Sequence, residues 1–257
     1  MTKTLSKIVS DKTSGSLEIL MELHEHLKAQ SSFIKIFPNF IESVEEKFPT
    51  FQNIQIYLQE MKKSLSKNKL DEFFLKYDDL LDNIYDKIFF KCKDELKNFN
   101  RILTISNSKT LFEIFVRLKK INPHLKIILC ESRPKFEGRI FAKKLLQNKI
   151  PVEMITEAMI FSSIKKIDAA IIGADAILKN GDVINKVGSS LIAISCKNSS
   201  KPFFVIADKS KIKSSNKFNQ KEMPPEEIWR HSPKNIVIKN FYFEQIDKSL
   251  ITKIISD

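Results

Sequence analysis

The sequence of 257 residues has few glycines, few cysteines and no long apolar run. Its five glycines form neither Gly-x-Gly-x-x-Gly nor Gly-x-x-x-x-Gly-Lys-Ser/Thr, which excludes the usual dinucleotide and P-loop fingerprints. Cys92, Cys130 and Cys196 are odd in number and far apart, so free thiols in a reducing compartment are favoured over disulfides. Without a run of about 18 apolar residues or an apolar signal-peptide core at its start, we expect a cytoplasmic protein without membrane contact.

Metal ligands are also scarce. The four histidines are scattered, and the pair His24 and His26 points to different faces of a predicted helix. No group of histidines and cysteines has the spacing that is typical of a zinc site. We therefore predict no metal site and no cofactor.

The excess positive charge is confined to the C-terminal part of the chain. Residues 1–98 contain 15 Lys/Arg and 16 Asp/Glu, whereas the remainder contains 28 and 15. Such a basic surface could attract a phosphorylated ligand, RNA or an acidic protein face. It could equally be a solvated, lysine-rich surface, because the basic–aromatic interleaving typical of single-strand binding is missing. Nucleic acid is therefore not the partner that we expect.

Residues 1–99 are predicted to form a helical N-terminal domain, because they contain a single glycine and no strand-like alternation. Candidates for the N-cap of the first clear helix lie in 11–16. One apolar face of that helix consists of Leu17, Leu20, Leu23, His24 and Leu27. Further helices are expected over 33–47, 51–66 and 69–99. A bundle or a cap is the expected form.

Residues 100–257 are predicted to form a Rossmann-like domain with a doubly wound parallel sheet. Short apolar runs alternate here with amphipathic stretches, which is the pattern of βαβ units. The expected strands are 102–105, 126–130, 152–155, 169–172 and 203–206. The expected helices between them are 109–120, 137–148, 157–165 and 189–197. A final strand over 235–239 and a final helix over 247–256 are expected, and 209–225 is predicted to be a surface loop rather than a lid.

Glycines mark one edge of this predicted sheet. Segment 173–177 follows a strand directly, so Asp175 lies at the carboxyl edge, where parallel sheets bind ligands. Gly188 then precedes a helix, whose first N–H groups, with the Lys186 ammonium and the serine hydroxyls that follow, could hold a phosphate. Asp175 could act as an acid or base, or it could only cap a helix or brace a loop.

Two other strand ends are expected at the same edge. Arg133, in segment 131–134, could clamp a phosphate with its guanidinium group, or it could form a salt bridge to a neighbouring loop. Ser106, in segment 104–108, has no obvious base beside it in the sequence. A strand-end or helix-capping role is therefore favoured over that of a nucleophile.

Together, these segments resemble one family of proteins. It comprises the alpha, beta and delta regulatory subunits of translation initiation factor 2B and two sugar-phosphate isomerases, for ribose-1,5-bisphosphate and methylthioribose-1-phosphate. The matching segments are 102–108 (ILTISNS), 131–138 (ESRPKFEG), 173–177 (GADAI) and 180–188 (NGDVINKVG). Order and spacing agree over residues 100–257, whereas the N-terminal third agrees only in being helical. The resemblance implies a helical domain followed by a Rossmann-like domain that dimerises.

The resemblance also implies roles for particular residues. In the isomerases, a cysteine and an aspartate move protons during aldose–ketose conversion. Asp175 matches the aspartate, but Ser106 stands at the cysteine position. A serine hydroxyl is a far weaker acid than a thiol, whose reference pKa is about 8.5, and is a poor proton carrier. The ligand-binding positions that the resemblance implies are Arg133, Glu137, Asn185, Lys186 and Gly188.

Two phosphate-binding arginines of the isomerases are not matched in the N-terminal third. The Arg-Gly-Ala loop corresponds to 14–16, which lacks arginine, and a second arginine corresponds to Phe48 in 48–50. Each charge-assisted hydrogen bond is worth about 1.5–3 kcal/mol. Loss of both, together with the missing cysteine, would abolish the usual tight capture of a sugar bisphosphate.

Three functions compete on this basis. The leading one is a non-catalytic subunit similar to those of initiation factor 2B, which acts through contacts with a homo-oligomeric or translation-factor partner and senses a sugar phosphate or nucleotide. The alternative is a sugar-phosphate isomerase, of the ribose-1,5-bisphosphate or methylthioribose-1-phosphate type, in which Asp175 is the acid or base. The third is RNA binding, which predicts a steep dependence of affinity on salt.

Overall fold

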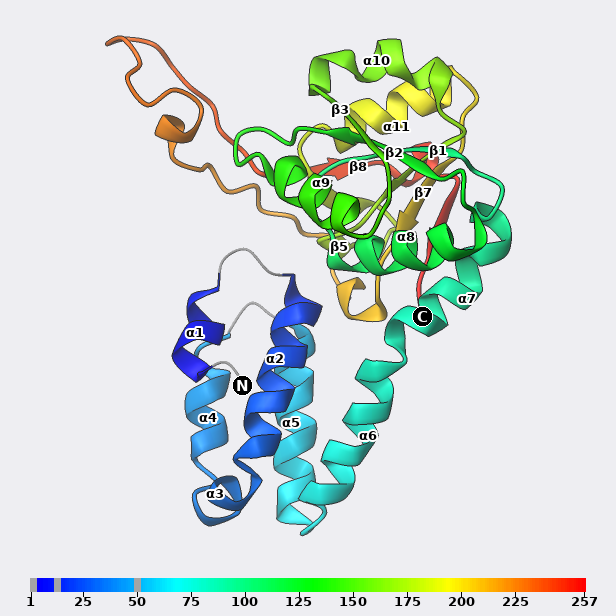
Figure 1. The fold of residues 1–257 in the computed structure, drawn as a ribbon. Coiled ribbons are helices and arrows are strands. Elements are labelled where there is room, and N and C mark those ends of the chain that lie inside the picture. Colours follow the sequence, from blue (N-terminus) through cyan, green and yellow to red (C-terminus); the bar gives the residue numbers. More distant parts are fainter. Residues whose placement is uncertain (1–3, 12–14, 49–51) are drawn as a thin grey trace. The chain divides into compact units, whose positions relative to one another are not determined.

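The computed structural model describes residues 4–11, 15–48 and 52–257, which form two compact units (Figure 1). The helical unit spans residues 1–84, and the α/β unit spans residues 85–257. The boundary predicted at residue 99 marks the point where strand–helix alternation begins. The boundary between the two compact units lies earlier, between residues 84 and 85. Helix α7 (Ile84–Leu96) therefore belongs almost entirely to the α/β unit.

The helical unit consists of short amphipathic helices. Its described helices are α1 (Leu5–Ser10), α2 (Ser16–Ala29), α3 (Ser31–Ile36), α4 (Phe40–Glu45), α5 (Gln52–Ser66) and α6 (Leu70–Asp82). The predicted apolar face of α2 is confirmed, because all five of its residues are buried. The N-cap of α2 is Gly15, which provides no side-chain hydrogen bond, and the candidates at 12–14 lie outside the described residues.

One predicted helix, 33–47, is interrupted by a proline. Helix α3 ends at Ile36 and α4 begins at Phe40. Pro38 lies between them, lacks an N–H to donate and disfavours helical dihedrals at the residue before it. The prediction of a single helix was wrong for this reason.

The long helix predicted over 69–99 is also divided, into α6 and α7. The side-chain amide of Asn83 donates a hydrogen bond of 2.9 Å to the carbonyl oxygen of Asp79. The same carbonyl also accepts the Asn83 N–H at 3.3 Å, and hydrogen bonds of an asparagine side chain to nearby backbone carbonyls favour the end of a helix. The prediction of one continuous helix was therefore wrong.

The α/β unit is built on a six-stranded sheet in which all paired strands run parallel. Its strands are β1 (Arg101–Thr104), β2 (Lys126–Cys130), β3 (Val152–Ile155), β4 (Ala169–Ile172), β7 (Phe203–Ile206) and β9 (Lys253–Ile255). The first five match the predicted strands to within one residue. They form because short runs of apolar residues can be buried on both faces, as β4 shows with all four residues buried.

Helices cover both faces of this sheet. In Figure 1, α8 (Lys109–Ile121) and α9 (Glu137–Gln147) lie on one side, and α10 (Ile160–Ser163) and α11 (Ser189–Asn198) lie on the other. The stretch predicted as a helix over 157–165 consists of α10 flanked by the 3-10 turns η1 (Glu157–Met159) and η2 (Ile164–Lys166). The predicted doubly wound α/β fold is confirmed.

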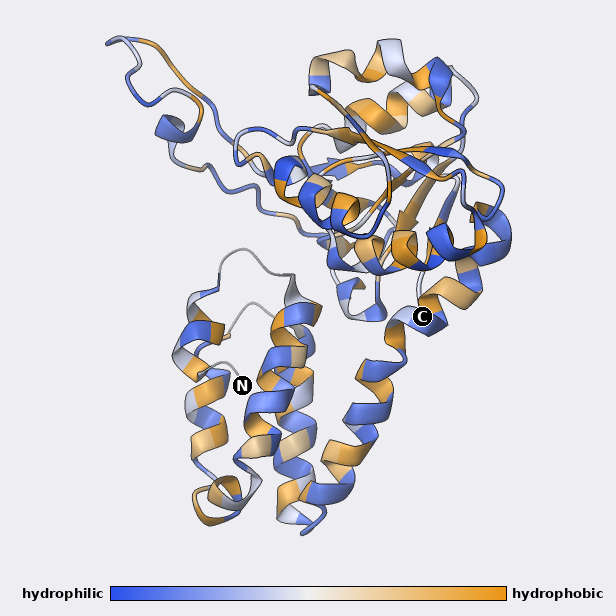
Figure 2. Cartoon of the chain, viewed as in Figure 1, coloured by the Kyte–Doolittle hydropathy of each residue, from blue (hydrophilic) through white to orange (hydrophobic). Residues whose placement is uncertain are grey.

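The strand order β3-β2-β1-β4-β7-β9 reverses its direction of winding between β1 and β4. In this architecture, the crevice at the carboxyl ends of the two strands that flank the reversal is the usual ligand site. Segments 105–108 and 173–175 follow these two strands. Figure 2 shows the strands of this sheet mainly in the colours of hydrophobic residues.

A small antiparallel sheet accompanies the main one. It contains β5 (Ala176–Ile177), β6 (Val183–Lys186) and β8 (Phe243–Ile246) in the order β5-β6-β8. Neither β8 nor β9 was predicted. The predicted helix over 247–256 was wrong, because the Asp247 carboxylate accepts a hydrogen bond from the Ser249 N–H and forms a tight turn. The β-branched residues beyond that turn pair with β7.

The segment 213–242, which we name the arm, leaves the sheet after β7 and returns at β8 (Figure 1). It contains the turn η4 (Pro225–Glu227) and a single bridge between Glu222 and Phe241. The strand predicted over 235–239 was wrong, since those residues pair with no strand, and Val237 is 80% exposed. Across the described residues, no helix combines the length and hydropathy that a membrane crossing requires.

Candidate functional site

The ends of β1 and β2 are tied together by serine residues. The Ser106 N–H donates to the Ser132 hydroxyl at 2.8 Å, and that hydroxyl donates to the Cys130 carbonyl at 3.0 Å. The Ser132 N–H in turn donates to Glu157, just beyond β3, at 2.6 Å. Ser106 and Ser132 have φ values of 70° and 68°. Left-handed backbone at non-glycine residues is costly and is concentrated at functional sites.

Two glycines bring further loops close to this edge. A Cβ at Gly173, directly after β4, would lie 3.0 Å from the Ser108 hydroxyl, which caps α8 by accepting from the Leu111 N–H. Gly188, which caps α11 with φ 100°, would place a Cβ 2.8 Å from Ile105. The loops after β1 and β4 and the start of α11 therefore converge, as the sequence predicted.

Asp175 lies in the loop between β4 and β5, where its N–H donates to the Ile184 carbonyl at 2.8 Å. The surrounding protein raises the pKa of its carboxyl group by desolvation, while the charges of Lys211 and Lys186 lower it and Glu137 raises it. However, its side chain is open to solvent. Because water can still stabilise the carboxylate, exposure limits this rise in pKa.

Lys186 is the most deeply buried charge of the candidate site, with 3% of its side chain exposed. Its ammonium group lies 2.6 Å from Oε1 of Glu137, the first residue of α9, and 4.8 Å from the centroid of the Tyr242 ring. Sequence analysis expected Lys186 at a helix opening, but it ends strand β6, paired with Phe243 of β8. The chain itself thus supplies a counter-ion for this lysine.

The start of α11 is occupied in a similar way. The Asn185 amide donates to the Ser189 hydroxyl at 2.9 Å. The Ser190 N–H donates to Oε1 of Glu244, on β8, at 2.8 Å. Negative groups are favoured at helix N-termini, so the Glu244 carboxylate takes a position that the sequence suggested for a phosphate.

Arg133 lies apart from these groups. Its guanidinium carbon is 4.9 Å from the Phe136 ring centroid, and its Nη2 donates to the Ile228 carbonyl of the arm at 3.2 Å. This arrangement corresponds to the alternative role of contacting a neighbouring loop. Phosphate clamping by Arg133 stays a prediction.

Sequence reasoning missed four polar residues that shape this edge: Ser132, Glu157, Glu244 and Tyr242. The first two lie two residues beyond the ends of predicted strands, so their positions offered a signal. The other two come from an unpredicted strand and the end of the arm. The Tyr242 hydroxyl donates to Glu227, whose carboxylate also lies 2.5 Å from the Lys135 ammonium. Nothing in the local sequence connects these residues to Lys186.

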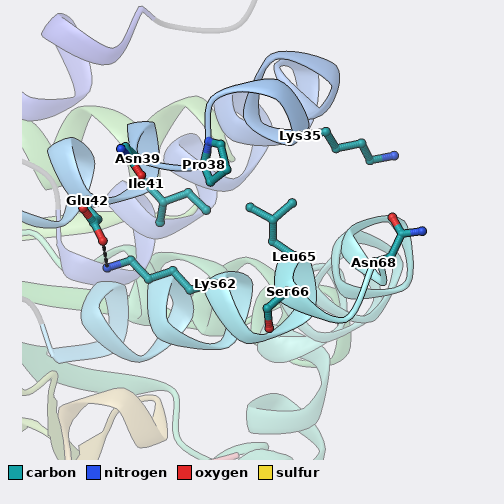
Figure 3. A pocket seen from close by; sticks show the side chains of 9 residues that line it. All are labelled: Lys35, Pro38, Asn39, Ile41, Glu42, Lys62, Leu65, Ser66 and Asn68. Atoms are coloured by element: carbon teal, nitrogen blue, oxygen red, sulfur yellow. Dashed lines mark ion pairs between the residues drawn. The ribbon is translucent and has the colours of Figure 1, made fainter.

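The helical unit contains a pocket of about 530 Å³, lined by none of the predicted site residues (Figure 3). Its lysines are already paired: Lys62 lies 2.5 Å from Glu45, and Lys35 lies 2.9 Å from Asp71. Pro38, Ile41 and Leu65 supply its apolar surface. The proposed equivalents of the phosphate loop, at 14–16, and of the second arginine, at 48–50, lie partly outside the described residues, although Phe48 is buried.

One cluster in the helical unit has the composition of a metal site. Ligand atoms of His24, Glu25 and Asp78 lie within 4.8 Å of one another. Both ring nitrogens of His24 are engaged, however, with the Tyr57 hydroxyl and with Asp78, each at 3.0 Å. Asp78 also accepts from Lys28 at 2.8 Å. Hydrogen bonds therefore account for this cluster without a metal.

Several known proteins are similar to this chain in sequence. A putative translation initiation factor eIF-2B subunit 2-like protein of Pyrococcus furiosus is 35% identical over 156 residues, covering 61% of this chain and 55% of that protein. The ribose 1,5-bisphosphate isomerase of Archaeoglobus fulgidus is 28% identical over 171 residues, covering 63% and 54%. The chain thus spans about half the length of these relatives.

A structural match covers nearly the whole chain. The crystal structure of 5-methylthioribose 1-phosphate isomerase from Pyrococcus horikoshii superposes with a TM-score of 0.81 at 23% identity, covering 98% of this chain and 81% of that one. At this identity, the match establishes the fold. The sequence model of the Initiation factor 2 subunit family matches residues 1–257. The chain therefore belongs to the initiation factor 2 subunit family.

Proposed function

We propose that this chain is a non-catalytic, regulatory-type member of its family, similar to the subunits of initiation factor 2B. It would act through contacts with other copies of itself or with a translation initiation factor. The residues at the carboxyl edge of the sheet would bind a sugar phosphate or a nucleotide as a signal. Relatives carry both initiation-factor and isomerase names, so the choice between these functions rests on the chemistry of the site.

The observation that carries this proposal is the serine at position 106. The resemblance places the proton-carrying cysteine there, and a hydroxyl does not replace a thiol in that role. Among the described residues, the Ser106 hydroxyl has no hydrogen bond to a base; only its N–H is engaged, with Ser132. A nucleophile or proton carrier needs such a base within reach. Asp175 would therefore lack its catalytic partner.

An isomerase assay on the purified chain tests the proposal. Ribose-1,5-bisphosphate and methylthioribose-1-phosphate would be supplied in turn, and thermal unfolding would be recorded in the same samples. We expect a rise in Tm with at least one of these two sugar phosphates, and no turnover. Robust turnover of either substrate would refute the non-catalytic function.

The second candidate function is an isomerase that uses Asp175 alone. It is favoured by the retention of Asp175, Asn185 and Lys186 at the positions that the resemblance gives to the proton carrier and the ligand contacts of the isomerases. This function requires that Asp175→Asn abolish turnover. Glu222→Gln, which removes the same charge from the arm, should leave turnover unchanged. A fully active Asp175→Asn variant would exclude this mechanism.

A further inference from the structure

The outer part of the arm, residues 228–239, extends away from both sheets of the α/β unit (Figure 1). Four of its large apolar side chains are each at least 40% exposed: Ile228, Trp229, Ile236 and Val237. Exposed apolar residues that are scattered singly are normal in soluble proteins, whereas a group of them on one segment indicates a binding surface.

The base of the arm, in contrast, is tied to the rest of the unit. The Met223 N–H donates to the Asn240 carbonyl at 2.8 Å, which joins the two limbs of the arm. The Lys135 ammonium lies 2.5 Å from the Glu227 carboxylate, which joins the arm to the loop before α9. The outer part is therefore presented on a fixed support, and a partner that binds it does not have to order the whole loop first.

Residues 236–238 have the composition of a strand but no strand beside them. They are three consecutive β-branched residues, of the kind that favours strands. Within the part of the chain that the structure describes, their backbone groups neither donate nor accept a hydrogen bond to another residue. An extended segment with an unpaired edge can add a strand from another chain, and main-chain hydrogen bonds then supply affinity.

The formal charges of the outer arm are all positive. Residues 228–239 contain Arg230, Lys234 and Lys239 and no acidic residue. Lys239 is paired with Glu222 at 3.2 Å, whereas Arg230 and Lys234 form no ion pair with any of the described residues. Opposite charges on neighbouring strands attract, so a strand that carries carboxylates suits this segment.

A second copy of the arm suits it less well. Antiparallel pairing of residues 236–238 with themselves would place Lys234 of one copy opposite Lys239 of the other, or one residue away from it. Like charges opposed in this way destabilise a strand pair. Residues 99–257 contain 28 Lys/Arg and 15 Asp/Glu, so the two approaching units would also repel each other.

A membrane and a nucleic acid also fit less well than a protein segment. The unpaired backbone groups of residues 236–238 would be costly in a bilayer. Residues 228–239 offer a single aromatic ring, that of Trp229, on which a base could stack. We propose that residues 228–239 are a docking strand for an acidic, extended segment of a partner protein. This inference rests on the proposed function and deepens it, because it names the chemistry of the partner in those protein contacts.

The single tryptophan of the chain, Trp229, provides the readout for a test. The full chain is titrated at constant ionic strength with a capped eight-residue peptide in which glutamate and valine alternate. We expect a saturable blue shift of the tryptophan emission, because the indole ring leaves water when the peptide binds. A capped peptide in which lysine and valine alternate should give no shift. The proposal is overturned by the absence of a saturable shift with the glutamate peptide, or by equal shifts with both peptides.

A charge reversal tests the electrostatic part of the proposal. Lys234→Glu should raise the Kd of the glutamate peptide by about threefold or more, since an attractive cross-strand pair becomes a repulsive one. Lys217→Glu is the matched control, because it makes the same change in net charge at an exposed position outside residues 228–239. Its Kd should equal that of the wild type. Equal increases in the two variants would show a general effect of net charge and would refute specific docking.

Proline substitutions test the strand pairing. The N–H groups of successive strand residues point to opposite edges, so a bound peptide uses either that of Val237 or those of its neighbours. Val237→Pro and Ile238→Pro remove these donors one at a time. We expect at least one of the two variants to raise the Kd of the glutamate peptide by about tenfold or more. An unchanged Kd in both variants would rule out pairing through residues 236–238.

The other occupants are distinguished in the same samples. Sedimentation velocity should give wild type and Lys234→Glu the same mass; a difference would show that the outer arm pairs with a second copy and would overturn the proposal. An equal shift of Trp229 emission with phosphatidylserine vesicles or with oligouridylate would overturn it in favour of a membrane or RNA. These readings involve no chemistry, so docking can fail while the isomerase assay still shows a non-catalytic chain, and the reverse.

Discussion

Two buried polar clusters of this protein, one in each unit, differ in how their hydrogen-bonding groups are paired. In the helical unit, His24 is buried, and each of its ring nitrogens has a partner, in Tyr57 and Asp78. In the α/β unit, acceptors on Asn107 and Glu137 are buried at the ends of strands without a donor. A satisfied network serves stability and specifies one packing, whereas an unsatisfied one indicates a place for a ligand.

The difference follows from how each unit is built. An amphipathic helix buries one whole face. A polar residue on that face must therefore form its hydrogen bonds with other residues inside the bundle. A parallel sheet buries its strands on both faces and leaves polar chemistry to the loops at one edge. Stability and ligand binding can therefore be perturbed separately, the first in either unit and the second at the edge of the sheet.

The largest expected effect is that of Gly138→Ala. A Cβ at this position would lie 2.0 Å from the backbone carbonyl oxygen of Cys130, which cannot rotate away. We expect a loss of about 3 kcal/mol or more in the stability of the α/β unit, by overpacking. Urea unfolding followed by pulsed hydrogen exchange would separate peptides of residues 1–84 from those of 85–257.

The matched control for this prediction is Gly15→Ala in the helical unit. No atom lies within 4 Å of a Cβ at Gly15, and its φ of −72° suits any residue. Its effect should therefore stay at about 1 kcal/mol or less, the typical cost of placing alanine at an N-cap. Equal effects of the two substitutions would contradict the structure around Gly138.

Gly188→Ala should have a smaller effect, in the same unit. Its φ of 100° strains any side chain, although the nearest contact, at 2.8 Å, is with the mobile end of Ile105. A loss of about 1–3 kcal/mol is expected from backbone strain of this kind. The same urea experiment would measure it. A neutral result would mean that the backbone at the start of α11 can relax into an ordinary conformation.

The sequence predicted the first five parallel strands well, because a strand buried on both faces has a short, continuous run of apolar residues. Residues 169–172 are all apolar and all buried, which is the pattern of a central strand in a parallel sheet. It also predicted that the ends of β1, β2 and β4 would converge, since parallel strands share one carboxyl edge. The family resemblance and the placement of Asp175 in the loop after β4 followed from the same segments.

The sequence could not predict partners that are distant in the chain. Glu137 and Lys186 are 49 positions apart, and Ser190 and Glu244 are 54 apart. Lys186 lies on β6 and Glu244 lies on β8, and these strands are neighbours in the small sheet. Strand β8 follows an irregular arm. The isoleucines near the C-terminus fit a helix and a strand about equally by spacing. Pairing with β7, which is a tertiary contact, decides for the strand.

Tyr57→Phe would test the satisfied network of the helical unit. It removes the hydroxyl that bonds the His24 ring at 3.0 Å and leaves the packing of a fully buried side chain in place. The stability of residues 1–84 should fall by about 1–2 kcal/mol, the usual cost of leaving a buried group unpaired. Peptides of residues 85–257 should unfold at the wild-type urea concentration. If they shift equally, the comparison between the two units fails.

The smallest expected effect is the dependence of the helical unit on acid. Hydrogen bonds from His24 and Lys28 hold the pKa of the Asp78 carboxyl group below its usual value. A lowered folded-state pKa contributes stability above the unfolded value of about 3.9, and that contribution is lost as the pH falls through the folded pKa. Asp78→Asn should therefore reduce the stability of residues 1–84 near neutral pH, by less than Tyr57→Phe does, since Asp78 is partly open to water. Between about pH 5 and pH 2, the wild type should lose this advantage and approach the variant. A constant difference across that range would show that Asp78 stabilises the unit by packing and not by its charge.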